Sequence, residues 1–284
     1  MRILSYDVPQ NWNYFLFGDS HIGARLRHAK GWRKMCDMMQ KPYDGVSRNI
    51  GIDHGDIIEA ITVDDPRYSE FDTKEQSILA QIQSAQRALY PIKDKLVCIL
   101  DGNHPFKLHK FGMITEYVCK ELGVTYGDYS AKITFKNKGR AQFKHYATHG
   151  SGSINSVADD PNRRLTNMKL SLKRKLSQMG HADAILQSMG HTHKLLTLSP
   201  TEQLYLTDDG KTVEQHYTPA GTPYSVFIHP DFRWYVNTGG FLKQYGDEGG
   251  SGYAERGMFP PLPLGFCIAK IRDNVIKDID KIVL

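Results

Sequence analysis

Cysteine is scarce in this sequence, and none of the four cysteines has the close spacing of a metal-binding or redox pair. Cys36, Cys98, Cys119 and Cys267 are far apart and lie in apolar or helical stretches. This pattern argues against a disulfide scaffold and against a structural zinc site built on thiolates. It favours packed, reduced thiols, and we therefore expect a cytoplasmic protein.

Long apolar runs and biased segments are also missing. No window approaches the roughly 18 uninterrupted apolar residues of a membrane span, and the N-terminal segment lacks the apolar core of a signal peptide. We therefore expect neither a leader nor a membrane helix. There is no internal repeat or low-complexity tract, and the glycine-rich segment 245–253 is interpreted as a surface loop.

The composition is that of a folded domain with a mild positive charge. Apolar residues make up 40% of the 284 positions and charged residues 24%, which is enough for a core and argues against disorder. The net charge of +5 suits an anionic partner without requiring one. Twelve histidines are more informative, because so many imidazoles suggest a metal or proton-transfer site.

The hydrophobic pattern predicts strands alternating with helices, followed by a β-rich part from about residue 200. This pattern indicates α/β layers in a single domain over 1–284. A helix start is also expected directly after Asp56. The expected helices are 25–39, 72–90, 110–122 (ended by Gly123) and 163–179, and the expected strands are 14–17, 50–53, 95–100, 131–136, 142–150, 183–193, 211–218, 224–229, 233–240 and 265–271.

Metal-ligating side chains follow the ends of the predicted strands. Residues i and i+2 of a strand share a face, so the pairs in "GDSH" and "GHTH" are expected to project together. Carboxylate, amide and imidazole donors suit Mn²⁺, Fe or Zn²⁺, and this many donors exceed the needs of one ion. We therefore expect two divalent ions, with Mn²⁺ favoured. The candidate ligands are Asp19, His21, Asp56, Asn103, His149, His191 and His193.

Each motif alone is a common turn or surface feature, but their fixed order is hard to explain by turns. The series "GDSH…GDIIE…GNH…HG…GHTH" resembles the signature of the calcineurin-like metallophosphoesterases, and "NTGG" at 237–240 is similar to a further turn of that family. The resemblance spans residues 18–193. It implies a four-layer α/β/β/α sandwich of two mixed sheets, with a dinuclear metal site at the sheet edges.

The resemblance also implies how the donors are shared. One ion would be held by Asp19, His21 and His193, and the other by Asn103, His149 and His191. Asp56 would bridge the two ions. The two imidazoles of "GHTH" would then each serve a different ion.

The implied reaction is hydrolysis of a phosphoester. Two cations neutralise the phosphate oxygens and acidify a water molecule, and the resulting hydroxide attacks phosphorus in line. His104 is the candidate proton donor to the leaving group. Glu59 is expected to orient His104 and favour its charged form, although it could instead be an ordinary glutamate at a helix start. Pro105 occupies the position at which the family usually has Asp or Glu. This difference could change the rate of hydrolysis, but it does not change the expected reaction class.

The substrate is less constrained than the chemistry. No arginine follows "GDIIEA" or "GNHPFK" directly, which disfavours a protein phosphatase. The basic helix that contains Arg163 and Arg164 could bind phosphates, or it could be a solvated face. We expect a phosphodiesterase or nuclease acting on nucleic acid or nucleotides. The alternatives are a small-molecule phosphomonoesterase or pyrophosphatase and, less favoured because the ligand set is complete, a non-enzymatic scaffold.

Overall fold

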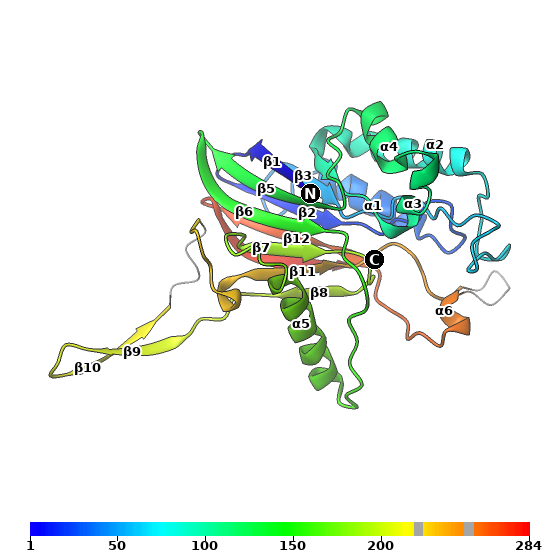
Figure 1. The fold of residues 1–284 in the computed structure, drawn as a ribbon. Helices are drawn as coiled ribbons and strands as arrows, with labels where there is room; N and C mark the ends of the chain where they lie inside the picture. Colours follow the sequence, from blue (N-terminus) through cyan, green and yellow to red (C-terminus); the bar gives the residue numbers. More distant parts are fainter. Residues whose placement is uncertain (219–223, 247–252) are drawn as a thin grey trace.

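Two mixed β-sheets form the centre of the molecule in a computed structural model that describes residues 1–218, 224–246 and 253–284 (Figure 1). The five-stranded sheet has the order β13-β12-β2-β3-β4, and the six-stranded sheet has the order β1-β5-β6-β7-β11-β8. The strands are β1 (Arg2–Asp7), β2 (Trp12–Phe17), β3 (Asn49–Asp53), β4 (Leu96–Ile99), β5 (Ser130–Asn137), β6 (Arg140–Thr148), β7 (Leu186–Met189), β8 (Leu195–Leu198), β11 (Trp234–Thr238), β12 (Gly265–Arg272) and β13 (Val275–Val283).

The alternation of side chains along β2 explains why the whole strand is buried. Trp12, Tyr14 and Leu16 pack into the core between the two sheets, where Trp12 stacks on Phe143 of β6 at 6.0 Å between ring centroids. The intervening Phe15 and Phe17 pack on the other face, against the helices. A strand covered on both faces consists of a continuous apolar run, as in the strand expected at 14–17.

Helices cover the outer faces of both sheets. On the five-stranded sheet, the covering helices are α1 (Ala29–Gln40), α2 (Ile78–Leu89) and α4 (Ile114–Leu122). On the six-stranded sheet, Leu172 and Leu176 of α5 (Pro161–Ser177) pack against Tyr146 and Tyr235. The resulting order of helices and sheets is compatible with the expected α/β sandwich. The short helices are α3 (Asn103–Phe106), α6 (Tyr253–Arg256), η1 (Tyr90–Lys95), η2 (His109–Phe111) and η3 (Pro230–Phe232).

A two-stranded hairpin, β9 (Leu204–Asp208) and β10 (Val213–Tyr217), projects from the body of the molecule (Figure 1). Its strands pair antiparallel, so that Leu204 lies opposite Tyr217 and all of β9 is exposed. Together with β11, β12 and β13, this hairpin gives the C-terminal part the β-rich character that its sequence predicts.

Two ion pairs of one aspartate connect three neighbouring segments of the six-stranded sheet. Asp183, just before β7, lies 2.5 Å from Nζ of Lys132 on β5 and 2.6 Å from Nζ of Lys144 on β6. Burial opposes ionisation of Asp183, but the two lysines outweigh it and lower its pKa to about 2.

Several element boundaries differ from the sequence-based expectations. Residues 72–77 are not helical, because Ser77 caps α2 by accepting a hydrogen bond from the amide of Ala80. The first helix begins at Ala29 rather than at 25, and the predicted helix start after Asp56 and the predicted strand at 224–229 are both wrong. Strand β1 was not predicted. Residues 247–252 of the predicted loop at 245–253 lie outside the described residues.

The expected packing of the cysteines is confirmed. All four cysteines are free and buried. Among the described residues, no helix is long and apolar enough to cross a membrane.

Sheet topology brings the motif loops to one edge. Strands β2, β3 and β4 run parallel to one another, and so do β6, β7 and β11. The carboxyl ends of parallel strands meet at the same edge of a sheet, which is where α/β proteins bind ligands. The loops after five of these strands carry the candidate ligands.

Candidate metal centre

The candidate ligands occupy strained backbone positions just beyond the strand ends. Five of them have left-handed φ values, which few residues other than glycine adopt: 53° at Asp19, 43° at His21, 49° at Asp56, 66° at His191 and 55° at His193. The paired residues therefore project together because of turn geometry, and the strand-face argument made from the sequence is wrong. Such strain persists where the surroundings enforce it, and it is concentrated at functional sites.

The glycines of the motifs are required by close approach of the loops. A Cβ on Gly102 would lie 2.1 Å from Oδ1 of Asp56, and a Cβ on Gly190 would lie 2.8 Å from Oδ2 of Asp19. The carboxylates therefore lie directly against the neighbouring turns. This contact explains the glycine that precedes Asn103 and His191 in the sequence.

The first donor cluster consists of Asp19, His21 and His193, whose ligand atoms lie within 4.8 Å of one another. Nε2 of His21 faces Nε2 of His193 at 3.1 Å, and the latter atom lies 3.5 Å from Oδ1 of Asp19. Asp19 and His21 are buried, and the side chain of His193 is 18% exposed to the pocket.

The second donor cluster is formed by Asn103, His149 and His191. Oδ1 of Asn103 lies 2.9 Å from Nε2 of His149 and 2.6 Å from Nδ1 of His191. A hydrogen bond on the side away from Asn103 orients the imidazole of His149: its Nδ1 donates to the carbonyl oxygen of His54 at 2.7 Å. Such a hydrogen bond behind a ligating imidazole fixes its tautomer and its direction.

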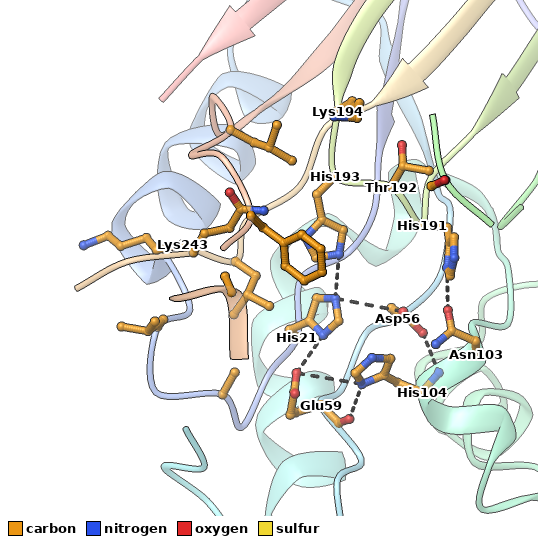
Figure 2. Close-up of a pocket in the computed structure, with 18 of the residues that line it drawn as sticks. His21, Asp56, Glu59, Asn103, His104, His191, Thr192, His193, Lys194 and Lys243 are labelled. Atoms are coloured by element: carbon orange, nitrogen blue, oxygen red, sulfur yellow. Dashed lines mark hydrogen bonds and ion pairs between the residues drawn. The ribbon is translucent and has the colours of Figure 1, made fainter. Parts of the chain in front are cut away.

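Asp56 lies between the two clusters (Figure 2). Its Oδ2 is 3.9 Å from Nε2 of His21 in the first cluster and 3.4 Å from Nε2 of His149 in the second. Its Oδ1 accepts a hydrogen bond from the backbone amide of His104 at 2.8 Å. From this position Asp56 could contact an ion in either cluster.

Burial and neighbouring charges shift the pKa values of several cluster residues. Burial raises the pKa of Asp19 to about 7. Burial also opposes charge on His21, but the nearby carboxylates, Glu59 foremost, outweigh it and raise its pKa to about 9. For His149, Asp56 foremost likewise outweighs burial and raises the pKa to about 9. These carboxylates therefore draw protons onto the neighbouring imidazoles.

The residues fit divalent metal ions. Imidazole nitrogens, carboxylate oxygens and an amide oxygen converge from separate loops, and two ring nitrogens face each other at 3.1 Å in the first cluster. These groups could hold ions such as Mn²⁺, Fe or Zn²⁺, as the sequence predicts.

Glu59 has a different partner from the one expected. Its Oε2 lies 2.7 Å from Nδ1 of His21 and 3.9 Å from Nδ1 of His104. The backbone carbonyl oxygen of Glu59, rather than its carboxylate, accepts from Nδ1 of His104 at 2.5 Å. Glu59 therefore orients a candidate metal ligand. His21, Glu59 and His104 also form a third group of converging donors, but these hydrogen bonds already use the atoms involved.

His104 is held differently from the sequence-based expectation. Burial lowers its pKa overall, and the charges of Asp56 and Glu59 oppose this effect without outweighing it. With Nδ1 donating to Glu59, Nε2 is left as an acceptor, and NH1 of Arg67 lies 3.3 Å from it. Arg67 was missed because it comes from the long segment before α2 rather than from a motif. The only signal was "DDPR", in which Asp65 can pair with Arg67.

A pocket of about 430 Å³ opens over the donor clusters. Its lining includes polar side chains, such as His104, Asn103 and Arg67, and apolar side chains, such as Leu242 and Phe259.

Arg163 and Arg164 are not among the described residues that line this pocket. The guanidinium of Arg164 instead donates to the carbonyl oxygens of Ala158 and Asp159, both at 2.9 Å. The predicted role of the two arginines in binding substrate therefore has no support from their position.

A buried polar network lies behind the ligands. Nε2 of His54 and Nε2 of His145 both lie 2.6 Å from Oγ of Ser188, and Nδ1 of His145 lies 3.1 Å from the hydroxyl of Tyr14. Asp53 accepts from the amide of Gly55. His54, His145 and Asp53 are thus engaged by hydrogen bonds behind the donor clusters.

Comparison with known proteins leaves the family unassigned. No protein-family model matches the chain, and no curated protein sequence matches it.

Proposed function

We propose that this protein is a metal-dependent phosphoester hydrolase of the calcineurin-like type, with a four-layer α/β/β/α fold, and that it cleaves phosphodiesters of nucleic acid or nucleotides. The observation that carries the proposal is the convergence of seven motif residues from five loops into two donor clusters with Asp56 between them. These residues are scattered over some 175 positions of the sequence. A non-enzymatic scaffold with the same fold would have no reason to retain the complete set of metal-ligating side chains.

Each residue has a role that follows from its contacts. Asp19, His21 and His193 would hold one ion, Asn103, His149 and His191 would hold the other, and Asp56 would contact both. Divalent ions bound there supply positive charge to the phosphate oxygens and lower the pKa of a water molecule. Mn²⁺ is our first choice among the ions.

His104 is the proposed proton carrier for the leaving oxygen, a role that requires its imidazolium form with a proton on Nε2. Its Nδ1 is engaged by the carbonyl of Glu59, so the ring presents Nε2 on the pocket side. The carboxylate of Glu59 contacts Nδ1 of His21 and thereby keeps Nε2 of His21 directed at the first cluster.

A small-molecule ester is the second candidate substrate. The pocket volume of about 430 Å³ falls in the range of sites that enclose a small ligand, and apolar lining residues such as Leu242 and Phe259 could contact the organic part of such an ester. In that case the enzyme would be a phosphomonoesterase or pyrophosphatase with the same centre.

The substrate class is tested by a panel in the presence of Mn²⁺. We expect hydrolysis of bis-p-nitrophenyl phosphate or of single-stranded DNA to exceed hydrolysis of p-nitrophenyl phosphate. Turnover of the monoester alone would support the second candidate. Inactivity on every substrate, with Mn²⁺ bound, would refute the proposed activity.

A further inference from the structure

Arg67 is a pocket residue that no motif of the sequence accounts for. It lies in the segment between the Glu59 loop and α2, and its side chain is 28% exposed. Three contacts with Asp65 fix it: its amide and Nε lie 2.9 and 3.0 Å from Oδ1, and NH2 lies 2.8 Å from Oδ2. Nζ of Lys107 also contacts Oδ2 of Asp65, at 3.1 Å. The guanidinium is therefore held in one orientation.

Hydrogen-bonding capacity remains on the guanidinium after these contacts. The fork with Asp65 uses two of its five N–H groups. NH1 faces Nε2 of His104 at 3.3 Å, which is long for a hydrogen bond. A phosphate oxygen would be a stronger acceptor for the same nitrogen, because a hydrogen bond between ionised groups is shorter and about twice as strong.

The location of Arg67 determines what it can reach. His104 is adjacent in sequence to Asn103 of the second cluster, and all three residues line the pocket. The pocket lysines Lys194 and Lys243 lie beyond His193, on the side away from His104 (Figure 2). Arg67 therefore supplies positive charge on the His104 side of the pocket.

We propose that Arg67 binds a non-bridging oxygen of the substrate phosphate on the His104 side of the centre, and that Asp65 is the positioning residue that holds it there. This inference rests on the proposed function, because it assumes a phosphoryl group over the two donor clusters. A planar fork suits phosphate better than a lysine ammonium does. The site thus carries a phosphate-binding arginine, although none follows the "GD" or "GNH" motifs directly.

The test compares Arg67→Ala, Arg67→Lys and Asp65→Asn with the unaltered protein, all loaded with Mn²⁺. We measure KM and kcat for bis-p-nitrophenyl phosphate, the inhibition constant of inorganic phosphate, and bound Mn²⁺. Arg67→Ala should raise the KM and the phosphate inhibition constant by roughly ten- to a hundredfold, the factor expected for losing one hydrogen bond between charged groups. Bound Mn²⁺ should not change. Arg67→Lys and Asp65→Asn should give smaller increases.

Two further measurements separate binding from a structural role. Millimolar guanidinium should partly restore the activity of Arg67→Ala, which a variant with a damaged fold would not show. Arg164→Ala, an arginine outside the pocket, is the matched control and should resemble the unaltered protein. A change of less than threefold in the phosphate inhibition constant of Arg67→Ala, or loss of Mn²⁺ in Arg67→Ala and Arg67→Lys alike, would overturn the inference.

The inference can fail separately from the proposed function. If no ester is hydrolysed, direct phosphate binding to the Mn²⁺-loaded protein still compares Arg67→Ala with the unaltered chain. Weaker phosphate binding by the variant would support the role of Arg67 even then, and equal binding would contradict it.

Discussion

Removing the carboxylate of Glu59 should weaken metal binding through His21. Oε2 of Glu59 lies 2.7 Å from Nδ1 of His21, and both side chains are less than a tenth exposed. Loss of such a partner behind a ligand costs about ten- to a hundredfold in metal affinity, or about 1.4–2.7 kcal/mol. Glu59→Gln keeps an oxygen that can accept from Nδ1 and loses only the charge, so we expect about tenfold. Glu59→Ala removes both and should cost about a hundredfold.

The assay is calorimetric titration of the metal-free variants with Mn²⁺. The exposed Glu70, in the segment that follows, gives the matched control Glu70→Gln, whose affinity should equal that of the unaltered protein. Thermal unfolding of each metal-free variant shows whether the fold is intact. Affinities of Glu59→Ala within twofold of the unaltered protein would refute the reasoning.

A second arm identifies the histidine through which Glu59 acts. In a His104→Ala background, Glu59→Gln should still weaken Mn²⁺ binding about tenfold, because the carboxylate contacts His21. If the effect disappears in that background, Glu59 acts through His104 instead, as the sequence-based interpretation held.

Three further predictions follow from other contacts. His104→Ala should lower kcat by about a hundredfold, the usual contribution of a proton carrier, while bound Mn²⁺ stays constant; equal losses of both would contradict its role. Gly190→Ala places a methyl group 2.8 Å from Oδ2 of Asp19 and should displace that ligand, so Mn²⁺ binding at the first cluster should fall in a titration, and unchanged binding would contradict the close approach. Asp183 has a lowered pKa of about 2, so its ion pairs contribute stability above pH 4 that is lost as the pH falls through 2. Urea unfolding of Asp183→Asn at pH 7 should show a loss of about 1 kcal/mol, a modest value because the pairs are partly exposed, and stability equal to the unaltered protein would refute this.

The candidate ligands could be predicted from the sequence because only a few residue types bind divalent metal ions. Carboxylate, amide and imidazole groups after buried strands could be recognised from the alternation of apolar segments and turns. Their direction could not be, since Asp19, His21 and His191 adopt left-handed backbone that depends on contacts between loops. The candidate residues were therefore predictable from the sequence, but they project together from turns and not from one face of a strand.

Contacts between distant segments account for most of the errors. A helix start was expected directly after Asp56, but the segment that follows pairs with the Asp19 loop, where the amide of Glu59 donates to the carbonyl of Ile22 at 2.9 Å. Arg67 reaches the pocket from a segment with no regular periodicity. By contrast, the end of α4 at Gly123, with a φ of 70°, was predictable because that signal is local.

The most direct test of the account is anomalous diffraction from crystals grown with Mn²⁺. The account predicts two peaks, one among Asp19, His21 and His193 and one among Asn103, His149 and His191, with Asp56 contacting both; crystals of Asp56→Ala should lose them. A single ion elsewhere, or none at saturating Mn²⁺, would contradict the central claim.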